Sequence, residues 1–213
     1  MTQLSDYDED VPESEVEKMM QDPSDDHVPA RGVVSFVGEM IKITLIALAI
    51  ILPVRYFLIK PFYVNGASME PSYFNKEYLI IDEISYRFNG PERGQVAVFR
   101  YPVDPSQFFI KRVIGLPGER VVIKDGEVTI YNDAFPKGTT LQELYLSPDA
   151  YTAGSVDITL GSDELFVLGD NRSASLDSRR FGPLPVNELI GKVWLRGWPP
   201  DRVGIINEHL FDF

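Results

Sequence analysis

The pattern of apolar and polar positions divides the chain into an N-terminal tail, one long apolar segment and a body of short apolar segments. Residues 1–32 are polar and acidic and contain three prolines, so we predict a disordered tail there. Residues 33–59 form the long apolar segment. From residue 60 onward, short segments rich in β-branched and aromatic residues alternate with Gly, Pro and Asn, as strands and turns do. The pattern therefore predicts one long helix followed by an all-β body.

The apolar segment has the length of a membrane-spanning helix. Between Ile41 and Ile59 it contains nineteen residues, roughly 28 Å of helix, and Lys42 and Arg55 are long enough to reach the head groups of a lipid bilayer. A segment that starts at Val33 is also compatible, so the borders stay open. The alternatives are a buried helix of a soluble protein, an interfacial helix and a cleaved signal peptide.

Two features favour a membrane anchor over these alternatives. An aromatic cluster follows the apolar segment, as in the aromatic belts at membrane interfaces; it comprises Tyr56, Phe57, Phe62 and Tyr63. The tail before the segment is long and acidic, unlike the short basic start of a signal peptide. Two basic residues flank the segment on each side, so the charges do not indicate which end is cytoplasmic.

The β body contains four predicted strands and one predicted hairpin. The strands run from Tyr78 to Asp82, Gln95 to Arg100, Phe108 to Ile114 and Leu189 to Leu195. Residues 121–124 and 127–131 form the arms of the hairpin, because Asp125-Gly126 readily takes the positive φ angles of a two-residue turn. Residues 125–163 are more polar, and we predict a small β insertion there, which leaves 60–124 and 164–213 for the β core.

Composition argues against several kinds of site and partner. The chain has no cysteine, which removes thiol nucleophiles, disulfides and thiolate metal sites. Of its two histidines, His27 lies in the acidic tail and His209 near the C-terminus, so we do not expect a Ser-His-Asp triad. The net charge is −12, of which −9 belongs to residues 1–30. The remainder has no cluster of Lys and Arg alternating with aromatic residues, so we expect no nucleic-acid partner.

Residues 65–71, at the start of the β body, place one serine between small residues and a proline. Gly66 and Ala67 allow another chain to approach the backbone closely, and Pro71 stiffens the end of the stretch. The Ser68 hydroxyl is therefore expected on a constrained, accessible turn. Such a turn presents a nucleophile only if a base lies within hydrogen-bonding reach, because a free serine hydroxyl is a poor nucleophile.

Lys111 is the candidate base, because the predicted strand 108–114 places it among apolar residues. With a period of two, Lys111 shares a face with Phe109 and Val113, while Arg112 points to the other face. To act as a base, Lys111 needs a pKa lowered from about 10.4 by roughly 2 to 3 units, which costs about 3 to 4 kcal/mol. The alternative is a lysine at a sheet edge, or one whose amine reaches solvent.

A third motif runs from Leu168 to Gly182 and contains Gly-Asp-Asn near its start. Behind the apolar segment, the motifs at 68–71, 93–99, 110–119 and 168–182 follow one another in the order found in the bacterial type I signal peptidases, which this sequence resembles. The members of that family are membrane-anchored serine endopeptidases with a Ser-Lys dyad. The resemblance covers nearly everything from the anchor to about Trp194. It implies the all-β signal-peptidase fold, which is also repressor-protease-like.

The resemblance implies a role for each matching residue. Ser68 is the nucleophile, and Lys111 is the general base that takes its proton and later returns a proton to the leaving amine. Ser175 matches the serine that orients the lysine amine. Ser173 and Ser178 compete for this role, and only the spacing of the motif separates the three.

The remaining matches are supporting residues. Asp177 and Arg179 match a pair that braces the loop, which agrees with their plain interpretation as a salt bridge and turn caps. Asp170 and Asn171 are assigned turn-forming roles only.

The resemblance indicates the oxyanion donors and the substrate pocket less clearly than it indicates Ser68 and Lys111. The backbone N–H groups of Ser68 and Gly66 are the expected donors, but some members have a serine hydroxyl where this chain has Gly66, so the second donor stays open. One such donor is worth about 3 to 4 kcal/mol. Four apolar residues match positions that could line shallow pockets, and core packing would explain them equally well; they are Val64, Met69, Phe109 and Ile110.

The resemblance also implies a reaction and a location. The family cleaves secretory preproteins after a small-x-small sequence through an acyl-enzyme, without a metal or an organic cofactor. The expected partners are therefore secretory preproteins and the lipid bilayer. The resemblance implies a single span in the cell membrane, with a cytoplasmic N-terminus and an extracytoplasmic catalytic domain. The alternatives are another Ser-Lys protease of the same fold, such as the self-cleaving repressor type, and an inactive membrane-tethered binding domain.

Overall fold

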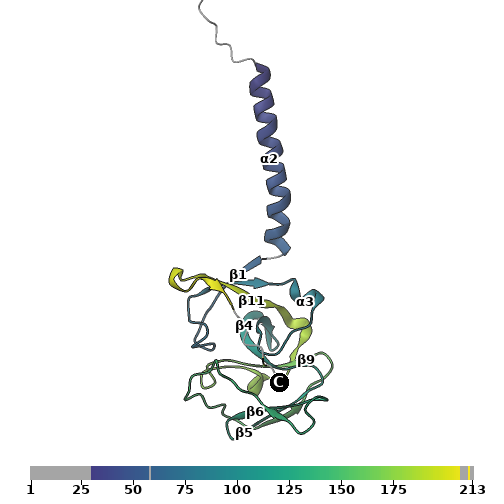
Figure 1. The fold of residues 1–213 in the computed structure, drawn as a ribbon, viewed down its shortest axis with the longest axis vertical. Coiled ribbons are helices and arrows are strands. Elements are labelled where there is room, and N and C mark those ends of the chain that lie inside the picture. Colours follow the sequence, from purple (N-terminus) through teal and green to yellow (C-terminus); the bar gives the residue numbers. More distant parts are fainter. Residues whose placement is uncertain (1–29, 58, 207–210, 212–213) are drawn as a thin grey trace, which may run out of the picture. The chain divides into compact units, whose positions relative to one another are not determined.

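The computed structural model describes residues 30–57, 59–206 and 211 (Figure 1). The chain divides into two compact units, residues 1–49 and residues 50–213. All of the described strands belong to the second unit, where they form two sheets. The fold is mostly β, as the sequence predicted.

Helix α2, Ala30–Phe57, is the long helix that the apolar segment predicted. Its stretch Val34–Leu52 has a mean hydropathy of 2.1 over nineteen residues and no buried residue, so it is long and apolar enough to cross a membrane. The helix starts at Ala30, three residues before the predicted anchor, and Ile59 at the other end already belongs to a strand. The borders of the anchor itself stay a prediction. The rest of the predicted tail, residues 1–29, lies outside the described residues.

The larger sheet has the strand order β1-β2-β11-β3-β4-β9-β10, and β12 pairs with β11. Every neighbouring pair is antiparallel. Its strands are Ile59–Tyr63 (β1), Tyr78–Asp82 (β2), Val96–Tyr101 (β3), Asp104–Gly115 (β4), Glu164–Leu168 (β9), Leu184–Pro185 (β10), Leu189–Trp198 (β11) and Gly204–Ile205 (β12). The four predicted strands correspond to β2, β3, β4 and β11, and the last two are longer than predicted.

Strand β1 was not predicted, because it begins two residues after helix α2 ends and contains Pro61. Proline is tolerated at this position since β1 is the edge strand of the sheet, where a missing N–H donor breaks no ladder. Phe62 and Tyr63, which were expected in an aromatic belt, lie in this strand, and the Tyr63 ring is 5.0 Å from that of Tyr78 on β2.

The smaller sheet has the order β7-β6-β5-β8. Its strands are Arg120–Lys124 (β5), Glu127–Tyr131 (β6), Thr139–Thr140 (β7) and Val156–Thr159 (β8). The predicted hairpin is confirmed: Lys124 pairs with Glu127, and both turn residues have positive φ, 53° at Asp125 and 89° at Gly126. Strand β5 belongs to this sheet, so the smaller sheet starts at Arg120 and not after Lys124, where the sequence division placed it.

Strand β3 is buried on both faces from Val96 to Phe99, and the adjacent β4 is buried from Lys111 to Gly115. Ala97 and Phe99 belong to one apolar cluster, whereas Val96 and Val98 belong to another. Short helices complete the second unit: Ser85–Phe88 (α3), Ser178–Phe181 (α4), and the 3₁₀ turns Val186–Glu188 (η1) and Pro200–Arg202 (η2).

Candidate active site

Ser68 lies in the segment between β1 and β2, on a turn that neighbouring backbone groups hold in place. Asn171 forms two of these contacts: its N–H donates to the Ser68 carbonyl at 3.0 Å, and its side-chain amide donates to the Ala67 carbonyl at 3.1 Å. Met69 anchors the other side of the turn, because its side chain is only 1% exposed and packs in the apolar cluster under the sheet. The accessible turn predicted for Ser68 is thus a constrained one, and Asn171 does more than form its own turn.

Lys111 projects from β4 to the Ser68 hydroxyl. Its side-chain nitrogen lies 2.8 Å from Ser68 Oγ and 2.7 Å from the Ile110 carbonyl oxygen, and 5.2 Å from the centroid of the Phe109 ring. The residue is only 4% exposed, so the alternative in which its amine reaches solvent is wrong. The structure brings the two residues together although 43 positions separate them in sequence.

The surroundings of Lys111 lower the pKa of its side chain below that of an ordinary lysine. Burial lowers its pKa from 10.5 to about 8, while the charges of Asp177 and Asp170 oppose this shift. No carboxylate of the described residues forms an ion pair with it. At mildly alkaline pH a large fraction of the amine is therefore neutral and able to accept a proton.

Ser175 lies beside Gly169, the residue that follows strand β9, and close to the Ser68 backbone. A Cβ added to Gly169 would collide with Ser175 Oγ and with the Ser68 carbonyl oxygen, so only glycine fits between them. Among the described residues, Ser175 Oγ is buried without a hydrogen bond of ordinary geometry, although its hydroxyl helps to lower the pKa of Asp177. Its contact with the Lys111 amine stays a prediction.

The two serines that compete with Ser175 are engaged elsewhere. Ser173 is exposed and donates to the Asn171 side chain at 3.0 Å. The Ser178 hydroxyl is buried and accepts the Val167 N–H at 3.0 Å. These partners leave Ser175 as the candidate among the three for orienting the lysine amine, and that role stays a prediction.

The pair expected between Asp177 and Arg179 is present. Arg179 donates from Nε to Asp177 Oδ1 at 2.9 Å and from Nη2 to Oδ2 at 2.8 Å, and the Gly169 N–H donates to the same carboxylate at 3.1 Å. Burial raises the pKa of Asp177, but the hydrogen bonds and charge of Arg179 outweigh this and lower it. Asp177 therefore stays charged, and its ion pair with Arg179 fixes the loop that carries Ser175.

Comparison with known proteins identifies the family to which this serine–lysine arrangement belongs. The family model described as signal peptidase, peptidase S26, matches residues 37–198. The chain belongs to the bacterial type I signal peptidases. It is similar to a probable signal peptidase I-2 of Synechocystis sp., with 37% identity over 177 residues, covering 80% of this chain and 77% of the relative. A signal peptidase I of Leptolyngbya laminosa is 38% identical over 175 residues, covering 78% and 82%.

A more distant relative, signal peptidase IB of Staphylococcus aureus, is 30% identical over 165 residues, covering 72% of this chain and 85% of the relative. Peptidases of this family are serine hydrolases, so the chain is an enzyme. Among the described residues, no three His, Cys, Asp or Glu side chains are grouped as metal ligands.

A cleft of about 540 Å³ opens beside Ser68 and Lys111 of this signal peptidase. Three of the four apolar residues predicted for the substrate pocket line it: Val64, Phe109 and Ile110. Met69 does not, and its assignment to the pocket is wrong, because the side chain points into the core instead. A sequence pattern cannot separate these two directions at a turn, where neither helical nor strand periodicity applies.

The expected oxyanion donors differ in availability. The Ser68 N–H forms no hydrogen bond among the described residues. The Gly66 N–H donates to the Asn75 side-chain oxygen at 3.0 Å, so the expectation that Gly66 provides a free donor is wrong. Gly66 has a φ of 104°, which favours glycine, and nothing lies within 4 Å of where its Cβ would be.

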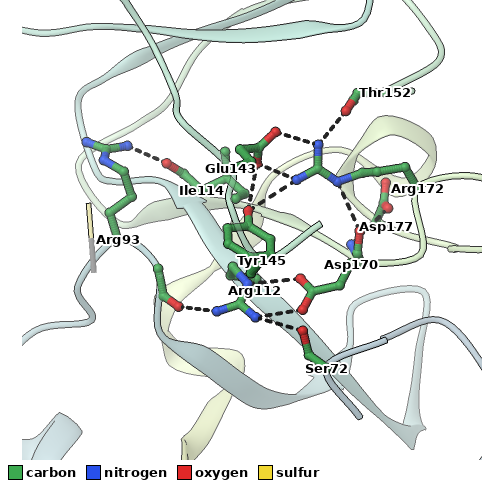
Figure 2. Close-up of polar contacts among 12 residues, drawn as sticks. Ser72, Arg93, Arg112, Ile114, Glu143, Tyr145, Thr152, Asp170, Arg172 and Asp177 are labelled. Atoms are coloured by element: carbon green, nitrogen blue, oxygen red, sulfur yellow. Dashed lines mark hydrogen bonds and ion pairs between the residues drawn. The ribbon is translucent and has the colours of Figure 1, made fainter. Parts of the chain in front are cut away.

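The sequence did not predict that the arginine beside Lys111 is buried with a partner. Arg112 donates from Nε to Asp170 Oδ1 at 2.9 Å and from Nη2 to Oδ2 at 2.6 Å, and Figure 2 shows the Tyr145 ring over its guanidinium. Nearby, Arg172 binds Glu143, with 2.8 Å between Nη1 and Oε2. An arginine in the middle of an apolar strand was the one available signal, because such a cation needs a buried partner.

Proposed function

We propose that this signal peptidase cleaves preproteins through a dyad of Ser68 and Lys111. The observation that carries the proposal is the 2.8 Å between Ser68 Oγ and Lys111 Nζ, at a position where burial lowers the pKa of the lysine to about 8. A neutral amine at hydrogen-bond distance is what a serine hydroxyl needs to become a nucleophile. No histidine lies among the described residues, so Lys111 is the base in reach.

In the proposed reaction, the neutral Lys111 amine takes the Ser68 proton as Ser68 Oγ bonds to the carbonyl carbon of the scissile peptide. The free Ser68 N–H is positioned to donate to the oxyanion. The tetrahedral intermediate then breaks its C–N bond, and the Lys111 ammonium gives its proton to the leaving amine. A water molecule, deprotonated by the same amine, hydrolyses the resulting acyl-enzyme and restores the Ser68 hydroxyl.

The apolar lining of the cleft supports a preference for apolar residues at the cleavage site. Val64, Phe109 and Ile110 line it beside the dyad. We infer that the preprotein binds in extended form and is cleaved after a small-x-small sequence such as Ala-x-Ala. The substrate is then selected by side-chain size and backbone shape, because most of the side chains that line the cleft are apolar.

We infer that helix α2 anchors the enzyme in a lipid bilayer, with its N-terminus cytoplasmic and the β body extracytoplasmic. The length and mean hydropathy of Val34–Leu52 support the anchor. The chain has no cysteine, so single Ser5→Cys and Ser147→Cys variants can report the orientation. On intact cells, a membrane-impermeant maleimide should label only Ser147→Cys. Labelling of Ser5→Cys alone would reverse the orientation.

The dyad is tested by incubating the detergent-solubilised full chain with a preprotein that carries an Ala-x-Ala site. We expect the chain to cleave after the second Ala, as read by mass spectrometry. Ser68→Ala and Lys111→Ala should each lower kcat/KM by at least about a thousandfold, since each removes one half of the proton transfer.

Two exposed residues of the same types provide matched controls: Ser155→Ala and Lys124→Met should leave kcat/KM unchanged. Full cleavage by either dyad variant would refute the mechanism. Equal cleavage of a preprotein with Leu in place of the second Ala would refute the size preference. No cleavage by the unaltered chain would support the inactive binding domain.

A further inference from the structure

Tyr145 is a buried residue close to the active site that the proposed reaction does not use (Figure 2). It belongs to the segment 141–152, which follows strand β7 and is held to the smaller sheet at both ends. At one end the Leu141 N–H donates to strand β6 at 2.9 Å, and at the other Thr152 forms a bridge with Gly126. Between these attachments the segment reaches strand β4 of the larger sheet through Tyr145.

The Tyr145 ring covers the guanidinium group of Arg112. Its centroid lies 3.9 Å from Arg112 Cζ, and the residue is only 7% exposed. The hydroxyl donates to the Glu143 carboxylate at 2.6 Å and lies 3.3 Å from Nη2 of Arg172, which binds the same carboxylate. An aromatic face attracts a desolvated cation, and the bonded hydroxyl fixes the far end of the ring. The ring therefore has one defined position.

Arg112 connects this ring to both members of the dyad. It follows Lys111 in strand β4, and its guanidinium holds the Asp170 carboxylate through two hydrogen bonds of 2.9 and 2.6 Å. The next residue after Asp170 is Asn171, which binds the carbonyl of Ser68 and the carbonyl of the residue before it. The chain of contacts runs from the ring to the base on one side and to the nucleophile on the other.

We propose that Tyr145 is a positioning residue for Ser68 and Lys111, acting through Arg112 and Asp170. The inference rests on the proposed function, because it presupposes the dyad. The ring keeps water away from the Arg112–Asp170 ion pair and holds the guanidinium plane against the carboxylate. Asn171 then keeps the serine at hydrogen-bond distance from the amine, where a displacement of about 1 Å is costly.

The charges around Lys111 give the proposal a distinct pH signature. Two carboxylates act on its amine, Asp170 and Asp177, and each is paired with an arginine, Arg112 and Arg179 respectively. Without the ring, water reaches the Arg112–Asp170 pair and the guanidinium is held less firmly against the carboxylate, so the negative charge of Asp170 is less compensated. This change raises the pKa of Lys111, and the acid limb of the pH–rate profile moves to higher pH.

The experiment compares the full chain with Tyr145→Leu in detergent on the same preprotein. We expect kcat at neutral pH to fall about tenfold, KM to stay within about twofold and the acid limb to move to higher pH. Tyr145→Phe should recover most of the lost kcat and restore the profile, because its ring still covers Arg112. If Tyr145→Leu does not fold, Tyr145→Met, which fills more of the space, replaces it with the same expectation.

The matched control is Tyr131→Leu. Tyr131 belongs to the smaller sheet too and lies under an arginine, with 4.9 Å from its ring to Arg120 Cζ, but that arginine is exposed and does not contact the dyad. We expect the kcat and the pH profile of this variant to match those of the unaltered chain. Equal losses in Tyr131→Leu and Tyr145→Leu would mean that the smaller sheet supports folding only, and would overturn the proposal.

Two further outcomes would also overturn it. A folded Tyr145→Leu with unchanged kcat and profile would show that the ring does not act on the dyad. A lower kcat with an unshifted profile, fully explained by a smaller fraction of active enzyme, would show a structural role alone. Failure of the proposed function is recognised separately, because Ser68→Ala would then cleave like the unaltered chain.

Discussion

Lys111 and Arg112 are neighbouring cations on strand β4. Both are buried, but their surroundings shift the pKa values of the two side chains in opposite directions. Lys111 faces a hydroxyl, a carbonyl oxygen and an aromatic ring, and burial lowers its pKa to about 8. Arg112 is buried as deeply, which by itself lowers the pKa, but its two hydrogen bonds to Asp170 raise the pKa above its usual value.

The difference shows how one strand holds both a cation with a lowered pKa and a structural ion pair. A buried cation without a partner gives up its proton readily, which is what catalysis requires, and it does so at a cost in stability. A buried cation with a bidentate partner keeps its charge and fixes two segments to each other. Alternation along the strand sends the two side chains to different faces, so each has its own environment.

The largest expected effect of breaking this arrangement comes from Arg112→Met. Removing the guanidinium leaves the Asp170 carboxylate buried and unpaired, since the two side chains are 2% and 0% exposed. We expect the free energy of unfolding to fall by about 3 to 5 kcal/mol, measured by thermal or urea unfolding of the detergent-solubilised chain.

The matched control for this prediction is Arg120→Met. Arg120 binds Asp157 with the same geometry, at 2.7 and 2.6 Å, but the two side chains are 44% and 58% exposed. We expect a much smaller loss, because water replaces the lost partner. Arg112→Met combined with Asp170→Leu should recover part of the lost stability. Equal losses for the two arginine variants would contradict the importance of burial.

A smaller effect of opposite sign is expected from Lys111→Met. Folding lowers the lysine pKa from 10.5 to about 8, so the folded chain binds fewer protons than the unfolded chain between these values. The cost in stability is present in full below about pH 8 and disappears as the pH rises to 10.5. At neutral pH the variant should therefore be more stable by about 1 to 3 kcal/mol, although inactive.

The comparison for Lys111→Met is the exposed strand residue Lys124. Lys124→Met should change the unfolding free energy little at any pH, because its amine stays in water in both states. The gain in Lys111→Met should shrink as the pH approaches 10.5. A loss of stability at neutral pH would mean that the amine has a favourable partner, and would contradict the contrast with Arg112.

Local patterns in the sequence were sufficient for several elements. Strand β2 lies where β-branched residues between turns predicted it, and the Asp125-Gly126 turn forms the predicted hairpin. Strand β1 was missed because it continues directly from an apolar helix, and only its position at the sheet edge makes Pro61 acceptable. That position depends on the fold as a whole.

The residues of the site that belong to sequence motifs could be predicted. The contacts between residues far apart in the sequence could not. Ser68 and Lys111 were identified from their motifs, and the structure places Ser68 Oγ and Lys111 Nζ 2.8 Å apart. Arg112 and Asp170 are separated by 58 positions, and the sequence around each residue does not indicate that the other is its partner. The direction of Met69 and the bond from Gly66 to Asn75 likewise depend on turn geometry.

The smallest of the expected effects is the pH dependence of cleavage, which distinguishes Lys111 from Arg112. Only Lys111 changes its charge near neutral pH, because Arg112 stays protonated throughout. With a pKa of about 8, kcat/KM should rise about tenfold for each pH unit below that value and level off above it. Initial rates of preprotein cleavage in buffers of constant ionic strength provide the measurement. A profile that levels off near the usual pKa of a carboxylate would mean that an acidic residue is the base, and the contrast between the two cations would then have no role in catalysis.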